Sequence, residues 1–171
     1  MEPVRAALES LAARLWDERR LLMLLLYRLT VARLLLSADE RRFVPDALRE
    51  VDRTVEMLRD EELRRDEAVR DLAAEWQLAP ERVTLPEIVR RSPPPYDHTF
   101  GEHLTAFQQL AEEIETISRH NRVLAHAAMQ DLSETIGQLT GDPAGPGATY
   151  DAHGRYGSTT SGVGARLREA L

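Results

Sequence analysis

The stretch Leu21-Leu-Met-Leu-Leu-Leu-Tyr-Arg-Leu-Thr-Val-Ala-Arg-Leu-Leu-Leu36 is the most apolar part of the chain. It is 16 residues long and contains Arg28 and Arg33, whereas a membrane-spanning helix needs about 20 predominantly apolar residues. We therefore predict a buried helix at this place, and we expect no membrane insertion.

The apolar spacing of this stretch continues toward the N-terminus. Steps of alternately four and three residues join Val4, Leu8, Leu11, Leu15, Glu18, Leu22, Leu25, Leu29, Ala32 and Leu36. Such a heptad seam is typical of helices that pack side by side, and it predicts a helix over residues 3–37. The additional leucines in the second half of this helix indicate contact with two neighbouring helices.

A second helix is predicted after Pro45, over residues 45–78, because proline is tolerated in the first turn of a helix but not in its interior. Its seam consists of Leu48, Val51, Val55, Leu58, Glu62, Arg65, Val69, Leu72 and Trp76. An antiparallel hairpin that turns near residue 41 sets Glu18 opposite Arg64 and Arg65. We therefore predict an ion pair between Glu18 and Arg65, or Arg64, which fixes the register of the hairpin.

A third helix is predicted over residues 99–139, after a proline-rich spacer. Its seam runs through Phe100, Leu104, Phe107, Leu110, Ile114, Ile117, Asn121, Leu124 and Ala128. Asn121 is the polar member of this seam, and a buried asparagine commonly fixes register between packed helices. After Ala128 the apolar positions shift to Leu132, Ile136 and Leu139, which indicates that the end of this helix faces something other than the hairpin.

These three segments predict an all-α, antiparallel three-helix, coiled-coil-like bundle over residues 1–140. Residues 141–171 differ in composition, because seven of the nine glycines lie between positions 141 and 164. A segment with so few aliphatic residues cannot bury enough apolar surface to order itself. We therefore expect a flexible, disordered arm at this end of the chain.

The composition excludes several classes of protein. The chain has 171 residues, a net charge of −7 and no cysteine, and its basic residues form no patch of the kind that nucleic-acid-binding proteins carry. No secretory signal is present, so we expect a cytoplasmic protein. Glycine-rich phosphate loops, nucleophile elbows and dinucleotide fingerprints are also absent. We expect neither enzymatic activity nor a cofactor.

One cluster offers an alternative in metal chemistry. His98 and Glu102 are four residues apart, and His103 follows directly. Residues with this spacing share one helical face, but the spacing matches no known zinc motif. We favour solvated histidines and predict no metal site.

The order of these elements resembles the FlgN family of flagellar export chaperones over about residues 5–157. The resemblance rests on Leu11, Leu15, Glu18, Leu22 and Leu25, followed by the Leu-x-Ser-Ala-Asp turn that ends at Asp39 and by Glu62-x-x-Arg65. It continues with Asn121-Arg-Val-Leu124 and with Tyr150-Asp-Ala-His-Gly154 in the glycine-rich arm.

The resemblance implies a chaperone that binds hook-associated proteins of the hook–filament junction and brings them to the flagellar type III export gate. It implies that the end of the third helix and the arm hold the client. The implied client-binding residues are Leu124, Ala128, Leu132, Ile136 and Leu139. The tyrosine implied to dock on the export gate is Tyr150, with Tyr156 as the alternative.

We expect such a chaperone to be a monomer or a weak homodimer. The main alternative is a structural coiled-coil protein that oligomerises through the same apolar surface and has no role in export. Periodicity does not separate the two, because a heptad pattern shows only that helices pack.

Overall fold

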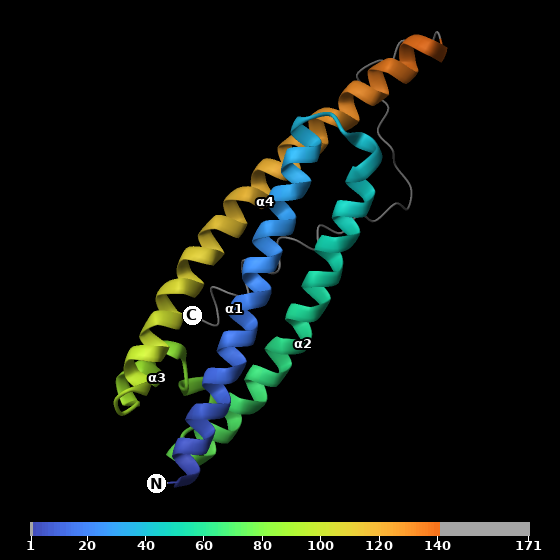
Figure 1. Cartoon of the computed structure of the whole chain (residues 1–171). Coiled ribbons are helices and arrows are strands. Elements are labelled where there is room, and N and C mark those ends of the chain that lie inside the picture. The colour runs from blue at the N-terminus through green and yellow to red at the C-terminus, as the bar shows by residue number, and fades with distance from the viewer. Residues whose placement is uncertain (1, 141–171) are drawn as a thin grey trace.

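The computed structural model describes residues 2–140, and these residues form only helices and the turns between them (Figure 1). The three long helices are α1 (Glu2–Ser37), α2 (Val44–Trp76) and α4 (Tyr96–Thr140). A short helix, α3 (Leu85–Arg91), and two 3-10 turns, η1 (Arg41–Phe43) and η2 (Pro80–Arg82), connect them. The predicted all-α class is confirmed.

Helix α1 lies between the other two long helices. α2 returns antiparallel to α1, and α4 runs parallel to α1 on its other side (Figure 1). α1 packs against both neighbours, whereas the backbones of α2 and α4 approach each other closely at few points. This double packing explains why leucines surround so much of α1.

The core follows the heptad seam of α1. The buried residues of α1 are Leu8, Leu11, Leu15, Glu18, Leu22, Leu25, Leu29 and Ala32, and every one of them belongs to the predicted seam. Burial of a leucine side chain contributes roughly 1.5–3 kcal/mol. This row is therefore the largest apolar contribution of any one helix face to the fold.

The hairpin turn is built by main-chain hydrogen bonds and one left-handed residue. The amide of Glu40 donates to the carbonyl oxygen of Leu35 at 2.9 Å, and Asp39 has a φ of 56°. Aspartate tolerates this conformation better than most residues. Pro45 then occupies the first turn of α2, where its missing amide hydrogen breaks no helical bond.

The buried face of α2 differs from the predicted seam in every second member. The structure buries Thr54, Glu61 and Ala68, where the sequence favoured Val55, Glu62 and Val69. Val55, Glu62 and Val69 are instead partly exposed. The prediction was wrong about which side chains are fully buried, because steps of three and four residues chose the next position at each of these levels. Val55 and Val69 still pack against the edge of the core.

The connection between α2 and α4 closes one end of the molecule. Val83, Leu85 and Ile88 are buried, and α3 packs against α4. α4 begins at Tyr96, three residues before the predicted start. Pro95 directly precedes this first helical residue, and its carbonyl accepts the amide of Thr99 at 3.3 Å, so the prolines lead into the helix.

Within the described residues, no helix is both long enough and apolar enough to cross a lipid bilayer. The predicted arm over residues 141–171, with Tyr150 and Tyr156, lies outside the described residues. The side chain of Leu139 also lies outside them, although its backbone belongs to α4.

Candidate functional site

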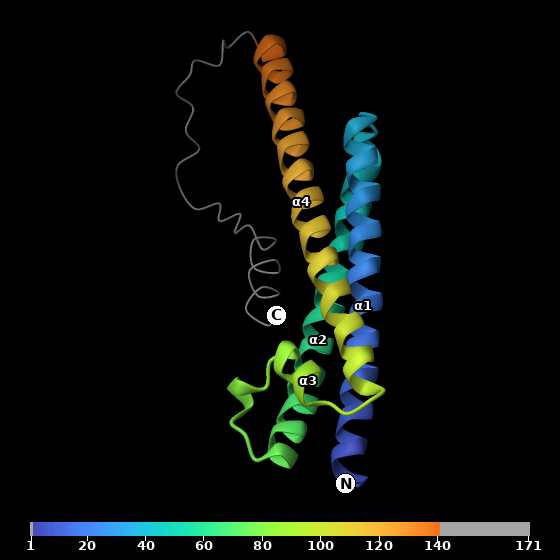
Figure 2. The same ribbon diagram turned by 90° about the vertical axis from the view of Figure 1, so that its left-hand side faces the viewer.

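The end of α4 extends past the hairpin turn that joins α1 to α2 (Figures 1 and 2). Of the predicted client-binding residues, Leu124 and Ala128 are partly buried. Leu132 is 52% exposed and Ile136 is 51% exposed. We call these four residues the distal stripe.

The distal stripe continues the same side of α4 that packs against α1. Leu132 follows Ile114 by 18 residues and Ile136 follows Phe100 by 36 residues, and 18 residues make about five helical turns. Ile114 and Phe100 are buried in the core. Leu132 and Ile136 are exposed because α1 has already ended at Ser37, and not because the apolar side has turned away.

Two polar contacts hold α4 beside α1 just before this extension. Asn121 Nδ2 donates a hydrogen bond to the main-chain carbonyl oxygen of Leu29 at 2.8 Å. Further along, Arg41 in the hairpin turn lies 3.9 Å from Asp131. The residues after Asp131 reach about 14 Å beyond this contact, at 1.5 Å per residue.

A layer of buried charges joins α1 to α2 near the middle of the hairpin. Arg65 donates a hydrogen bond to Glu18 at 2.8 Å, which is the ion pair expected from the register of the two helices. Glu61 is also buried, and it accepts hydrogen bonds from Arg14 at 3.2 Å and Arg64 at 3.0 Å. The buried acid of α2 is thus Glu61, whereas the predicted Glu62 is partly exposed.

The environment of Glu18 raises its pKa to about 6. Burial is the main cause, because a charged carboxylate loses its hydration there. The positive charge of Arg65 opposes this effect, and the negative charges of Glu62 and Glu61 add to it. Near neutral pH, Glu18 is therefore a carboxylate held at a free-energy cost to the folded state.

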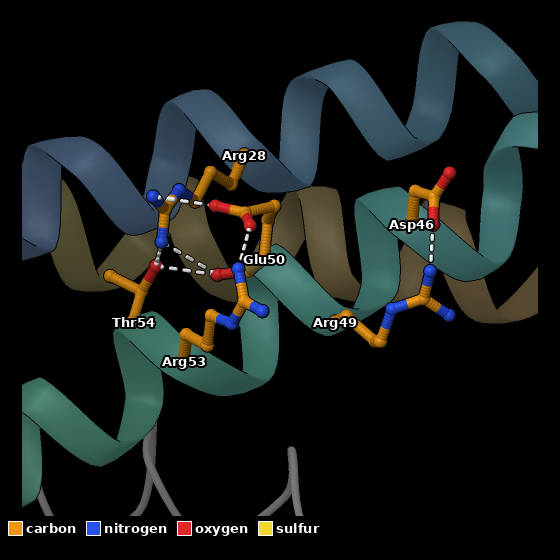
Figure 3. Close-up of polar contacts among 6 residues, drawn as sticks. All are labelled: Arg28, Asp46, Arg49, Glu50, Arg53 and Thr54. Atoms are coloured by element: carbon orange, nitrogen blue, oxygen red, sulfur yellow. Dashed lines mark hydrogen bonds and ion pairs between the residues drawn. The ribbon is translucent and has the colours of Figure 1, made fainter.

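A second polar layer explains why an arginine occurs within the apolar stretch of α1. Arg28 reaches across to α2, where its guanidinium donates to the carbonyl oxygen of Glu50 at 2.7 Å and to the hydroxyl of Thr54 (Figure 3). It also lies 2.8 Å from the Glu50 carboxylate, which pairs with Arg53 as well. The Thr54 hydroxyl also donates to the carbonyl oxygen of Glu50 at 2.8 Å, so Arg28 adds a second partner to this buried side chain.

The structure places the members of the histidine cluster in different surroundings. His98 is 81% exposed and lies 3.5 Å from Glu102, whereas His103 is 1% exposed. The described residues contain no group of three or more histidine, aspartate and glutamate side chains arranged to hold a metal ion.

The interpretation of His103 as a solvated residue was wrong. Its ring packs edge-on against Trp16 at 4.8 Å and stacks on Phe107 at 5.9 Å. Burial lowers the pKa of His103, the charge of Arg19 lowers it further, and Glu102 partly offsets both. His103 is therefore a neutral member of the interface between α1 and α4.

Two exposed apolar residues near the distal stripe were missed. Val123 is 65% exposed and lies beside Leu124. Met129 is 68% exposed and lies beside Ala128 on the extended part of α4. Each was missed because it lies one residue away from the stripe and so falls outside the steps of three and four residues that predicted the seam. Exposed apolar residues of the hairpin lie at the same end of the molecule as the stripe, namely Leu34, Phe43 and Leu48.

The comparisons with known proteins agree with the resemblance found in the sequence. A family model described as "FlgN protein" matches residues 1–158, which is most of the chain. No curated protein and no solved structure matches this chain. Since the match includes all of the described helices, the chain belongs to the FlgN family, a family of chaperones in flagellar assembly.

Proposed function

We propose that this chain binds the hook-associated proteins of the hook–filament junction in the cytoplasm and delivers them to the flagellar export gate. Membership of the FlgN family supports a role as a flagellar export chaperone, and members of the family bind hook-associated proteins. The observation that carries the proposal is the distal stripe on the extended end of α4.

The chemistry of this surface suits a helical client. The stripe prolongs the face of α4 along which α1 packs, so a client helix laid against it takes the place that α1 leaves after Ser37. Amphipathic helices are commonly recognised in this way, by apolar residues spaced three and four positions apart. We infer that Leu124, Ala128, Leu132 and Ile136, with Leu139, form this client surface.

The proposed mechanism is mass action without catalysis. A chaperone that covers an aggregation-prone helix lowers the concentration of the free client and stabilises the bound form. The proposed role of Tyr150 is to dock on the export gate, with Tyr156 as the alternative. Glu18, Arg65 and Asn121 serve to fix the register of the helices that present the client surface.

Co-purification with the two hook-associated junction proteins of the same organism tests this proposal. The intact chain and a chain ending at Leu139 are each expected to fold, and the intact chain is expected to retain one or both junction proteins. Weaker retention by the shortened chain would assign part of the client surface to residues 140–171. If the folded intact chain retains neither protein, the proposal is wrong.

A second candidate is a structural role through self-association. Trp16, Met23, Tyr27 and Leu34 are exposed on α1, and their spacing of seven, four and seven residues keeps them on one side of the helix. Sedimentation of the purified chain tests this candidate. A stable dimer that a Met23→Asp substitution dissociates would favour it over the chaperone role.

A further inference from the structure

A cavity of about 220 Å³ lies where α1, α2, the η2–α3 connection and α4 meet. Apolar side chains form most of its wall, including Leu15, Val69, Leu85, Ile88 and Phe107. None of the contacts that define the distal stripe involves this cavity, which lies in the other half of the molecule. It is therefore a feature distinct from the proposed client surface.

Glu18 places a buried hydrogen-bond acceptor in the wall of this cavity. The residue lines the cavity and is 1% exposed. Arg65 donates to Oε1, whereas Oε2 is buried and has no hydrogen-bond partner among the described residues. A buried polar atom without a partner destabilises a fold, so a ligand that donates to Oε2 would relieve this loss.

The charges around the cavity favour a cation over an anion. Three carboxylates line it, those of Glu18, Asp66 and Glu81, against the single guanidinium of Arg65. Arg65 already contacts both Glu18 and Asp66, the latter at 3.4 Å. Glu18 is buried, whereas Asp66 and Glu81 are exposed, and an excess of carboxylates along a cleft attracts positive ligands.

The size of the cavity limits the ligand to a small group. Pockets for whole drug-sized ligands have about 300–1,000 Å³, so this cavity accommodates one side chain or one short molecule. An ammonium group is compact and carries three donors, whereas a guanidinium is broad and planar. The apolar walls in turn suit an aliphatic stem.

We propose that this cavity binds a primary ammonium group on a short aliphatic stem, with Glu18 Oε2 accepting a hydrogen bond from the ammonium. Such a group occurs in the lysine side chain of a partner protein and in free alkylamines. The chain itself contains no lysine, so no lysine of its own competes for the site.

Titration of the intact chain with n-pentylammonium chloride, followed by methyl NMR, tests this inference. The methyl signals of Leu15, Leu85 and Ile88 are expected to shift in a saturable manner. n-Pentanol has the same stem without the charge and is expected to bind at least tenfold more weakly. Equal affinity for the amine and the alcohol, or no saturable shift with the amine, would overturn the inference.

Two variants separate the acceptor from a general effect of charge. Glu18→Gln keeps the shape of the side chain and is expected to weaken amine binding at least tenfold. Glu112→Gln removes an exposed acid of α4 and is expected to leave the affinity for the amine within twofold of that of the unchanged chain. If both variants bind the amine like the unchanged chain, Glu18 is not the acceptor and the inference is wrong.

A further titration identifies the source of the ammonium group. Nα-acetyl-lysine methylamide presents a lysine side chain with a blocked backbone. Binding of both this compound and n-pentylammonium supports a lysine of a partner protein as the occupant, whereas binding of n-pentylammonium alone supports a free amine. These readouts use the isolated chain, so they are independent of whether it binds hook-associated proteins.

Discussion

The side-chain amide of Asn121 on α4 donates a hydrogen bond to the main-chain carbonyl of Leu29 on α1, at 2.8 Å. Because this carbonyl belongs to the backbone, the contact fixes the position of α4 along α1 without depending on an α1 side chain. The other polar atom of the amide, Oδ1, is buried and has no partner among the described residues. Asn121 thus fixes the register of α4 against α1 and lowers the stability of the fold, as polar residues in coiled-coil seams do.

Replacement of Asn121 by leucine is expected to raise the free energy of unfolding by about 1 kcal/mol. The substitution removes one hydrogen bond, but it also removes a buried acceptor without a partner and adds apolar burial. Urea denaturation followed by circular dichroism measures the change. A loss of more than about 1 kcal/mol would show that the bond to Leu29 outweighs both gains.

Glu18→Gln is expected to raise the free energy of unfolding near pH 7 by about 2 kcal/mol. The pKa of Glu18 is about 6 in the folded chain against 4.5 for an unperturbed glutamate, so the folded state holds the carboxyl proton more tightly than the unfolded chain does. Stability from this group is therefore complete below pH 4.5 and is lost as the pH rises through 6.

Urea denaturation of both proteins between pH 4 and pH 8 tests this expectation. The difference in the free energy of unfolding between Glu18→Gln and the unchanged chain is expected to be near zero at pH 4. It is expected to reach its full value above pH 7. Glu112→Gln, which changes an exposed acid of α4 away from this layer, is the matched control. A difference that does not vary with pH would contradict the assignment.

His103→Leu is expected to raise stability and to remove an acid-sensitive component. Both ring nitrogens of His103 are buried and have no hydrogen-bond partner among the described residues, and the pKa of His103 is lowered. Below about pH 6.5 the unfolded chain therefore gains a proton that the folded chain resists, so stability falls as the pH falls.

His103→Leu is expected to raise the free energy of unfolding at pH 7.5 by about 1 kcal/mol. This increase is expected to be larger toward pH 5. Thermal or urea denaturation at the two pH values measures it. His126→Leu changes an exposed histidine of the same helix and is expected to have little effect at either pH. A fall in stability for His103→Leu would indicate that the ring contacts with Trp16 and Phe107 outweigh the unpaired nitrogens.

The packed face of α1 was predictable because its members are nearly all leucine. A heptad of leucines specifies one helix face whatever packs against it. Even its charged member, Glu18, was predictable, since the polar positions of both helices fell at the same level of the hairpin. The ion pair between Glu18 and Arg65 follows from that register.

The packed face of α2 was only half predictable. Thr54 and Glu61 are buried because Arg28 and Arg14 reach them from α1. No property of the α2 sequence alone distinguishes Glu61 from Glu62. His103 was missed for a related reason, because its burial depends on Trp16 in α1 and is not a property of its own helix.

The exposed end of α4 was predicted from a shift in the apolar spacing after Ala128, but the physical cause is different. Leu132 and Ile136 stay in line with core residues of the same helix. They are exposed because α4 is longer than the hairpin beside it. Helix lengths relative to one another, rather than periodicity, therefore locate the candidate client surface.

We propose that this extended end of α4 holds the client. Leu132 and Leu63 are both exposed leucines on long helices, at 52% and 63% exposure, but Leu63 lies on α2 and outside the distal stripe. The Leu132→Asp and Leu63→Asp variants therefore make a matched pair. Both are expected to keep the helical content and the thermal stability of the unchanged chain.

Calorimetric titration of these two variants and the unchanged chain with each hook-associated junction protein is the most direct test. We predict that Leu132→Asp weakens binding of the junction protein at least tenfold and that Leu63→Asp leaves it within twofold. Equal binding by all three folded proteins would contradict the assignment of the client surface to the end of α4.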